Sequence, residues 1–157
     1  MTPEDLVEIE LIKRLKYRYL RYLDQKLFDE MRDVFTVDAT ARYSGGHYSF
    51  DGVDAIIDFL KESMSSEEFL SSHRCHHPEI DLIGSERATG IWALEDTVID
   101  TQFEITLRGA AFYRDEYLKI DGKWKIHSTG YERTFEEMES RKENPSLTLT
   151  QRKWGAE

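Results

Sequence analysis

Positive charge, cysteine and long apolar runs are all in short supply in this 157-residue chain. Lys and Arg number 21 against 31 Asp and Glu, and the net charge of -10 repels phosphate backbones and anionic membranes. We therefore expect neither nucleic acid nor a membrane as a partner. The single cysteine, Cys75, excludes an internal disulfide. No apolar run approaches the roughly 20 residues of a membrane-spanning helix, and the opening MTPEDLVEIE does not resemble a signal peptide, so we expect a cytoplasmic protein.

No linker, repeat or low-complexity stretch divides the chain. We therefore expect residues 1–157 to form one domain, with an extended or loosely attached tail after about residue 140. A domain of this length buries about two-thirds of its unfolded surface, so a substantial core is expected.

Helical periodicity dominates the first part of the chain, and strand patterns dominate the rest. Thr2 and Pro3 open a helix whose apolar residues recur at helical spacing as far as Leu23, with Lys13, Arg14, Lys16, Arg18 and Arg21 on its polar side. Further helices are expected at 26–35 and 53–64. Strands are expected at 37–43, 47–50, 70–82, 87–100, 103–120 and 123–135.

This order, helices first and long antiparallel strands after, is typical of an α+β fold. A strongly curved sheet wrapped around a long helix makes a cone with an open mouth, and such a cavity is a natural site for a small molecule. Oligomerisation is expected because the curved sheet leaves a broad outer face, for which the candidate covering residues are Phe103, Ile105, Leu107 and Tyr113.

An aspartate and a histidine on neighbouring strands are the first candidates for chemistry. Alternation places Asp96 on the same face as Trp92 and Leu94, where a carboxylate is costly to bury unless it is paired. The simpler interpretation is that Asp96 lies at a wet strand end. On the preceding strand, a histidine oriented by a neighbouring carboxylate would make a general base near neutral pH. Alternation there puts on one face Ser71, His73, Cys75, His77 and Glu79.

A metal site is the alternative for the three histidines His73, His76 and His77. We expect none, because adjacent residues of a strand point to opposite faces and zinc needs three or four convergent ligands.

Tyrosines and one arginine complete the candidate set. The first helix carries Tyr17, Tyr19 and Tyr22 before Asp24, and a hydroxyl near the mouth could donate a proton or stabilise an oxyanion. Spacing does not choose among these tyrosines, which fit a core role equally well. Tyr43 is a further candidate. Arg133 could bind a substrate carboxylate or phosphate, although a simple pair with an acidic residue is favoured.

Several segments together resemble the SnoaL-like, nuclear transport factor 2-like (NTF2-like) proteins, and the bacterial bile acid 7α-dehydratases most closely. The resemblance extends from about residue 9 to 140 and is carried by IKRLKYRYLRYLD at 12–24, HHPEI at 76–80, ATGIWALED at 88–96, GAAFY at 109–113, YLKIDGKW at 117–124 and TGYER at 129–133. It implies an NTF2-like cone with a deep apolar cavity, usually oligomeric, and a trimer in preference to a dimer.

The resemblance also implies a cofactor-independent dehydratase whose catalytic residues match Tyr19, Asp24, His73 and Asp96. In that mechanism His73, held by Asp96, removes a proton made acidic by a conjugated carbonyl. Tyr19 donates to the departing hydroxyl or to the dienolate oxygen, and Asp24 orients Tyr19 or His73. The substrate contacts expected are Tyr43, Trp92, Phe112, Tyr131 and Arg133.

The substrate implied is a small apolar or polycyclic hydroxylated enone, steroid-like and free or carried as a coenzyme A thioester. No metal or other cofactor is expected. Two other functions stay open: a ketosteroid isomerase-like enzyme, and a noncatalytic ligand-binding protein similar to the small subunits of ring-hydroxylating oxygenases.

Overall fold

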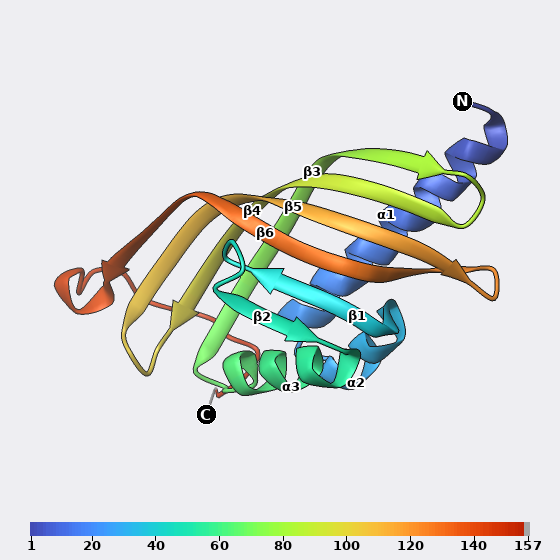
Figure 1. Cartoon of the computed structure of the whole chain (residues 1–157). Helices are drawn as coiled ribbons and strands as arrows, with labels where there is room; N and C mark the ends of the chain where they lie inside the picture. Colours follow the sequence, from blue (N-terminus) through green and yellow to red (C-terminus); the bar gives the residue numbers. More distant parts are fainter. Residues whose placement is uncertain (156–157) are drawn as a thin grey trace.

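The computed structural model describes residues 1–155 (Figure 1). Its helices are α1 (Pro3–Asp24), α2 (Phe28–Met31) and α3 (Val53–Met64), with 3-10 turns at Arg32–Val34 and Arg141–Glu143. Its strands are β1 (Phe35–Tyr43), β2 (Tyr48–Asp51), β3 (Phe69–Ile83), β4 (Arg87–Asp100), β5 (Ile105–Ile120) and β6 (Lys123–Ser140).

One curved sheet forms the wall of the molecule. Its six strands lie in the order β2-β1-β6-β5-β4-β3, and every neighbouring pair is antiparallel except β1 with β6, which is parallel. In Figure 1 the long helix α1 lies along one face of this sheet, while α2 and α3 lie near the short strands β1 and β2. The predicted α+β cone is therefore confirmed.

Helix α1 starts as its sequence predicts. The backbone N–H of Thr2 donates to Asp5 Oδ2 at 2.7 Å, and the backbone N–H of Asp5 donates to Thr2 Oγ1 at 3.2 Å, so the two residues form a capping box. The helix buries Ile12, Leu15, Tyr19, Leu20 and Leu23 against the sheet. None of the helices within residues 1–155 combines the length and apolar character that crossing a membrane requires.

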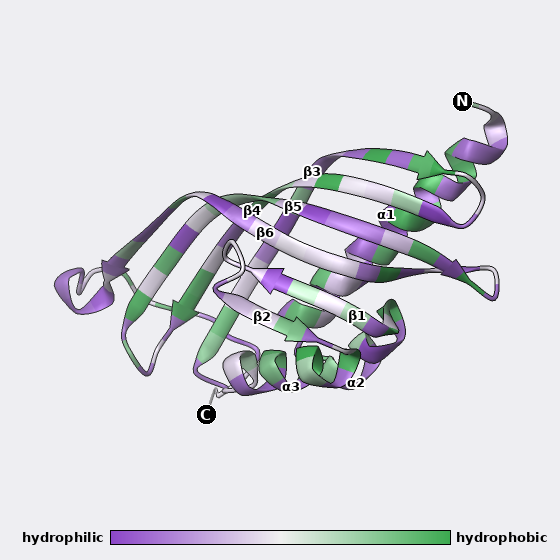
Figure 2. Ribbon diagram, viewed as in Figure 1, coloured by the Kyte–Doolittle hydropathy of each residue, from purple (hydrophilic) through white to green (hydrophobic). Residues whose placement is uncertain are grey.

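Alternation along β4 and β5 determines which side chains face the core. Figure 2 shows hydrophobic and hydrophilic residues alternating along these strands, and the inward set includes Trp92, Leu94, Tyr113 and Tyr117, all buried. Tyr113 is therefore an interior residue. Three of the four side chains expected to cover the outer face point inward instead, and only Phe103, 67% exposed, stays outside.

A bulge in β3 corrects the face predicted for that strand. Between His76 and Glu79, β3 has one residue more than β4, and His77 takes a positive φ of 29° there. The alternation shifts at this point, so His77 and Glu79 are exposed while Ile80 packs against the core. His77 and Glu79 therefore do not share the face of His73.

The C-terminal end differs from the prediction as well. Strand β6 continues to Ser140, because residues 135–140 pair with residues 105–110 of β5. Beyond it the chain turns back, and Arg152 anchors the tail by donating to the carbonyl of Glu67 at 2.8 Å.

Candidate active site

A cavity of about 530 Å³ opens between α1, α3 and the concave side of the sheet. Its interior is mostly apolar and aromatic, with polar groups at a few positions. Side chains that are exposed at the surface, among them Tyr48, Ser63 and Glu136, mark its mouth. Its apolar lining comprises Leu23, Phe59, Leu60, Met64, Phe69, Val98, Ile105 and Leu107.

A histidine on β3 faces the last residue of α1. His73 Nδ1 lies 2.7 Å from Asp24 Oδ1, and the backbone N–H of His73 donates to Asp24 Oδ2 at 2.8 Å. Ser71 Oγ donates to Asp24 Oδ1 at 2.9 Å. The carboxylate is thus held by three donors on one strand, and the His73 side chain is only 11% exposed.

The contact with Asp24 shows which ring nitrogen of His73 carries a hydrogen. A carboxylate can only accept, so Nδ1 carries the hydrogen, and the neutral form of the ring has its lone pair on Nε2. Within residues 1–155 no hydrogen bond reaches Nε2. His73 lines both the cavity and a separate surface hollow that Asp24 also lines, so the ring stands between the two. The arrangement makes His73 the candidate general base of this cavity.

The carboxylate that holds His73 comes from α1 and not from the neighbouring strand. His73 and Asp96 are direct cross-strand neighbours, as predicted. The side chain of Asp96 nevertheless turns to Arg133, which forms a two-pronged ion pair with both of its carboxylate oxygens. Of the two roles expected for Asp24, orienting Tyr19 or orienting His73, the geometry corresponds to the second.

A glycine makes the Asp96–Arg133 pair possible. Strand β5 runs between β4 and β6, and Gly109 is the residue on it that pairs with Asp96. A Cβ at Gly109 would lie 2.5 Å from Arg133 Nη1, so any larger residue would push the guanidinium away. Asp96 is consequently well paired although its side chain is only 3% exposed.

Four tyrosines gather at the buried end of the cavity. The hydroxyls of Tyr19 and Tyr43 lie 3.1 Å apart, and the rings of Tyr113 and Tyr131 pack edge to face with centroids 5.4 Å apart. Burial raises the pKa of Tyr19, Tyr43 and Tyr113 well above the usual 10.0, so these phenols stay protonated. They are neutral hydrogen-bond donors at one end of a cavity whose wall carries His73.

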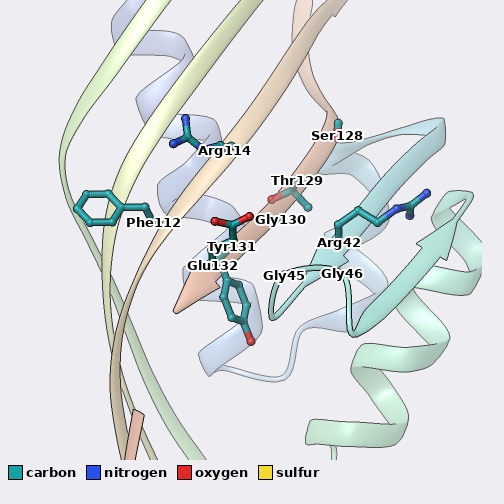
Figure 3. Close-up of a pocket in the computed structure, with 10 residues that line it drawn as sticks. All are labelled: Arg42, Gly45, Gly46, Phe112, Arg114, Ser128, Thr129, Gly130, Tyr131 and Glu132. Carbon is teal, nitrogen blue, oxygen red and sulfur yellow. The ribbon is translucent and has the colours of Figure 1, made fainter. Parts of the chain in front are cut away.

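Two predicted substrate contacts lie outside this cavity. Trp92 is fully buried in the core and donates through Nε1 to Tyr117 at 2.9 Å. Phe112, 46% exposed, lies on the other face of β5, beside a shallow surface hollow of about 370 Å³. Figure 3 shows Phe112 and Arg114 on one side of that hollow and Arg42 on the other.

Comparison with known protein families agrees with this architecture. A family model described as a SnoaL-like domain matches residues 4–130, which is most of the chain. The chain belongs to the SnoaL-like family.

Solved structures with the SnoaL-like fold are similar over most of their length. A protein assigned as a scytalone dehydratase from Novosphingobium aromaticivorans is 23% identical, with a TM-score of 0.81 over 87% of this chain and 91% of that one. A hexachlorocyclohexane dehydrochlorinase from Novosphingobium barchaimii is 16% identical, with a TM-score of 0.77 over 85% and 91% of the two chains. At these identities the similarity establishes the fold.

One charged group lies inside this SnoaL-like domain where the sequence pattern does not predict it. Lys16, expected on the polar side of α1, is completely buried, and its Nζ lies 2.8 Å from Asp115 Oδ2. The same ammonium lies 3.4 Å from the centroid of the Tyr113 ring. Asp115 also accepts from Tyr117 and Thr129, both at 2.7 Å. The available signal was position, because Lys16 falls four residues after Ile12 and four before Leu20, within the apolar stripe.

The other two histidines of β3, His76 and His77, do not line the cavity. His76 is exposed on the outer face, with Nε2 3.5 Å from Glu95 Oε2. Among residues 1–155, no three His, Cys, Asp or Glu side chains group as metal ligands would.

Proposed function

We propose that this SnoaL-like protein is a cofactor-independent lyase that eliminates water from a hydroxylated ketone or enone. The observation that carries the proposal is the Asp24–His73 pair, which leaves His73 Nε2 free at the wall of a largely apolar cavity. A dyad of this kind can take a proton from carbon and stabilise the imidazolium that forms.

The steps follow from the positions of the groups. Nε2 takes a proton from a carbon acidified by the conjugated carbonyl, and the electron pair of that C–H bond forms the new double bond. As the C–O bond breaks, the proton on Nε2 passes to the leaving hydroxide, which departs as water. Tyr19 and Tyr43 donate to the carbonyl oxygen while negative charge builds on it, and their raised pKa keeps them protonated.

Asp96 has a supporting role in this proposal. Its pair with Arg133 places a cation and an anion together at the cavity, which both residues line with His73. The two together orient the substrate ring, and the proton for the departing oxygen comes from His73.

The proposed substrate is a small, apolar, ring-containing molecule. The sequence resemblance to bile acid 7α-dehydratases supports a steroid-like or other polycyclic compound, and the apolar lining of a cavity of about 530 Å³ is compatible with one. The same resemblance supports a homotrimer as the working assembly. The scytalone dehydratase and dehydrochlorinase assignments of the structural relatives support elimination as the reaction class.

An isomerase is the second candidate, because the same base and the same tyrosine donors would move a double bond in a ketone that has no leaving group. A noncatalytic ligand-binding role is less well supported, since such a protein needs no base with a free lone pair in its cavity.

The decisive experiment incubates wild-type and His73→Ala protein with hydroxylated and non-hydroxylated enones and identifies products by mass spectrometry. Loss of water that depends on His73 is the expected result. A shifted double bond without loss of mass would support the isomerase. Equal product from both proteins would exclude His73 as the base, and binding without any conversion would favour the noncatalytic role.

A further inference from the structure

The charges that line the cavity are mostly negative. Among the described lining residues the charged side chains are Asp96, Asp100, Glu136 and Arg133, three carboxylates and one guanidinium. His47 and His73 complete the ionisable set apart from the tyrosines. The three carboxylates and the one guanidinium together carry a net charge of -2 when all four are ionised.

The one cation is already engaged on two sides. Arg133 forms its ion pair with both oxygens of Asp96, and its Nε lies 3.1 Å from Glu136 Oε2. Asp96 holds the guanidinium so firmly that the pKa of Arg133 is raised, and an incoming anion would have to displace a buried carboxylate. Arg133 therefore lacks the free face that a substrate carboxylate or phosphate would need.

Two cations on the segments around the mouth have carboxylate partners of their own. Lys142 Nζ lies 3.1 Å from Glu104 Oε2, and Arg152 Nη2 lies 3.6 Å from Glu68 Oε1. Lys26 donates to the backbone carbonyl of Phe69 at 2.7 Å, which fixes its ammonium in place and leaves its charge. By contrast, Asp100 Oδ1 accepts only from the backbone N–H groups of Gln102 and Phe103, and Glu136 shares the single guanidinium of Arg133 with Asp96.

We propose that this cavity selects against anions, so that its substrate enters as a free uncharged molecule and not as a carboxylate or a coenzyme A thioester. Asp100 and Glu136 create the selection by repelling negative charge at the mouth. The inference rests on the proposed function in one respect: both take this cavity as the place where the substrate binds.

Local charge at the mouth can be measured without any substrate. In a Cys75→Ser background, Ser63→Cys places a thiol among the exposed lining residues, and Ser85→Cys places one in the β3–β4 turn away from the cavity. Each thiol is alkylated with neutral iodoacetamide and with anionic iodoacetate. The ratio of the two rate constants reports local potential, because any change in the pKa of the thiol affects both reactions equally.

The expected iodoacetate-to-iodoacetamide ratio is about fivefold lower for Ser63→Cys than for Ser85→Cys, the order of effect that two unit charges at about 8 Å have in water. Adding Asp100→Asn and Glu136→Gln should restore it, whereas Glu116→Gln, on the outer face of β5, should not. About 1 M salt should remove most of the difference.

Equal ratios at the two thiols would overturn the proposal, and so would a low ratio that survives the Asp100→Asn and Glu136→Gln changes. The alkylation ratios do not depend on turnover. A protein that shows the expected ratios but no activity would therefore refute only the proposed lyase function. A coenzyme A thioester used as efficiently as its free ketone would refute only the selection against anions.

Discussion

Helix α1 contributes to two ionic pairs that differ in what they leave unsatisfied. Lys16 and Asp115 are sealed in the core, where Asp115 receives three partners and Lys16 lies against the ring of Tyr113. Asp24 and His73, two turns further along the helix, are partly accessible, and Nε2 of His73 has no partner within residues 1–155. The buried pair is sealed from solvent, whereas the accessible pair leaves one ring nitrogen open, as the proposed base requires.

The largest expected effect comes from Asp24→Asn. The amide can donate to Nδ1 of His73, which moves the ring hydrogen to Nε2 and removes the base. We expect turnover to fall by about 100- to 10,000-fold. Steady-state kinetics measure this, and the urea midpoint should stay almost unchanged because Asp24 is partly solvated.

Glu10→Gln on the exposed side of the same helix is the matched control and should leave turnover unaltered. Normal turnover of the Asp24→Asn protein would show that the Asp24–His73 pair, like the Lys16–Asp115 pair, has no part in the reaction.

The next effect is on stability and comes from Lys16→Met. The change leaves Asp115 buried without its counter-ion, which costs about 3–5 kcal/mol. Equilibrium unfolding in urea measures the loss. The double change Lys16→Met with Asp115→Leu removes both charges and should recover part of it, because Tyr117 and Thr129 then lose their acceptor. A single variant as stable as wild type would show that the pair can be broken without penalty.

Gly109→Ala tests the third ionic contact, between Asp96 and Arg133. The added methyl group would meet Arg133 Nη1 and displace it from Asp96, with an expected loss of about 1–3 kcal/mol in urea unfolding. In an Arg133→Met background the added methyl group no longer meets a guanidinium, so the Gly109→Ala change should cost less stability. Equal losses in both backgrounds would indicate that Gly109 is needed for another reason.

The smallest effect concerns Cys75, beside His73 on the cavity side of β3. Burial raises the pKa of its thiol to about 11, so the native protein should react slowly with iodoacetamide at pH 9 and faster as the pH approaches 11. Because the raised pKa belongs to the folded state, the thiol favours folding less as pH rises above the unfolded pKa of about 8.5. Fast labelling of folded protein at pH 8 would contradict this.

The sequence predicted the helices and strands well because their periodicity is strong. Thr2 and Pro3 marked the start of α1, and the predicted bounds of β4 match the structure. Neighbouring strands also brought His73 opposite Asp96. Periodicity contains no information on curvature, however, and it is the bend of β3 toward α1 that brings His73 to Asp24.

The buried lysine and the bulge were missed for a related reason. Lysines of an amphipathic helix usually lie on its exposed face, and this rule predicts an exposed Lys16. Its position in the sequence nevertheless fits the core face of the helix, where the structure buries it. Alternation likewise assumes an uninterrupted strand, and the available signal of the bulge was Pro78, directly after His77, because proline within a sheet is confined to edge strands, strand starts and bulges.

The bulge in β3 also makes this strand one residue longer than its facing requires. His73 and Ile80 are seven residues apart, an odd number, yet both face the interior because one residue is taken up at the bulge. Loss of one residue between them would remove the bulge and leave them six apart, so strict alternation would still turn both inward, whereas one added residue would turn one half of the strand outward. In the lineage of this protein we therefore expect this stretch to tolerate the loss of one residue better than the gain of one.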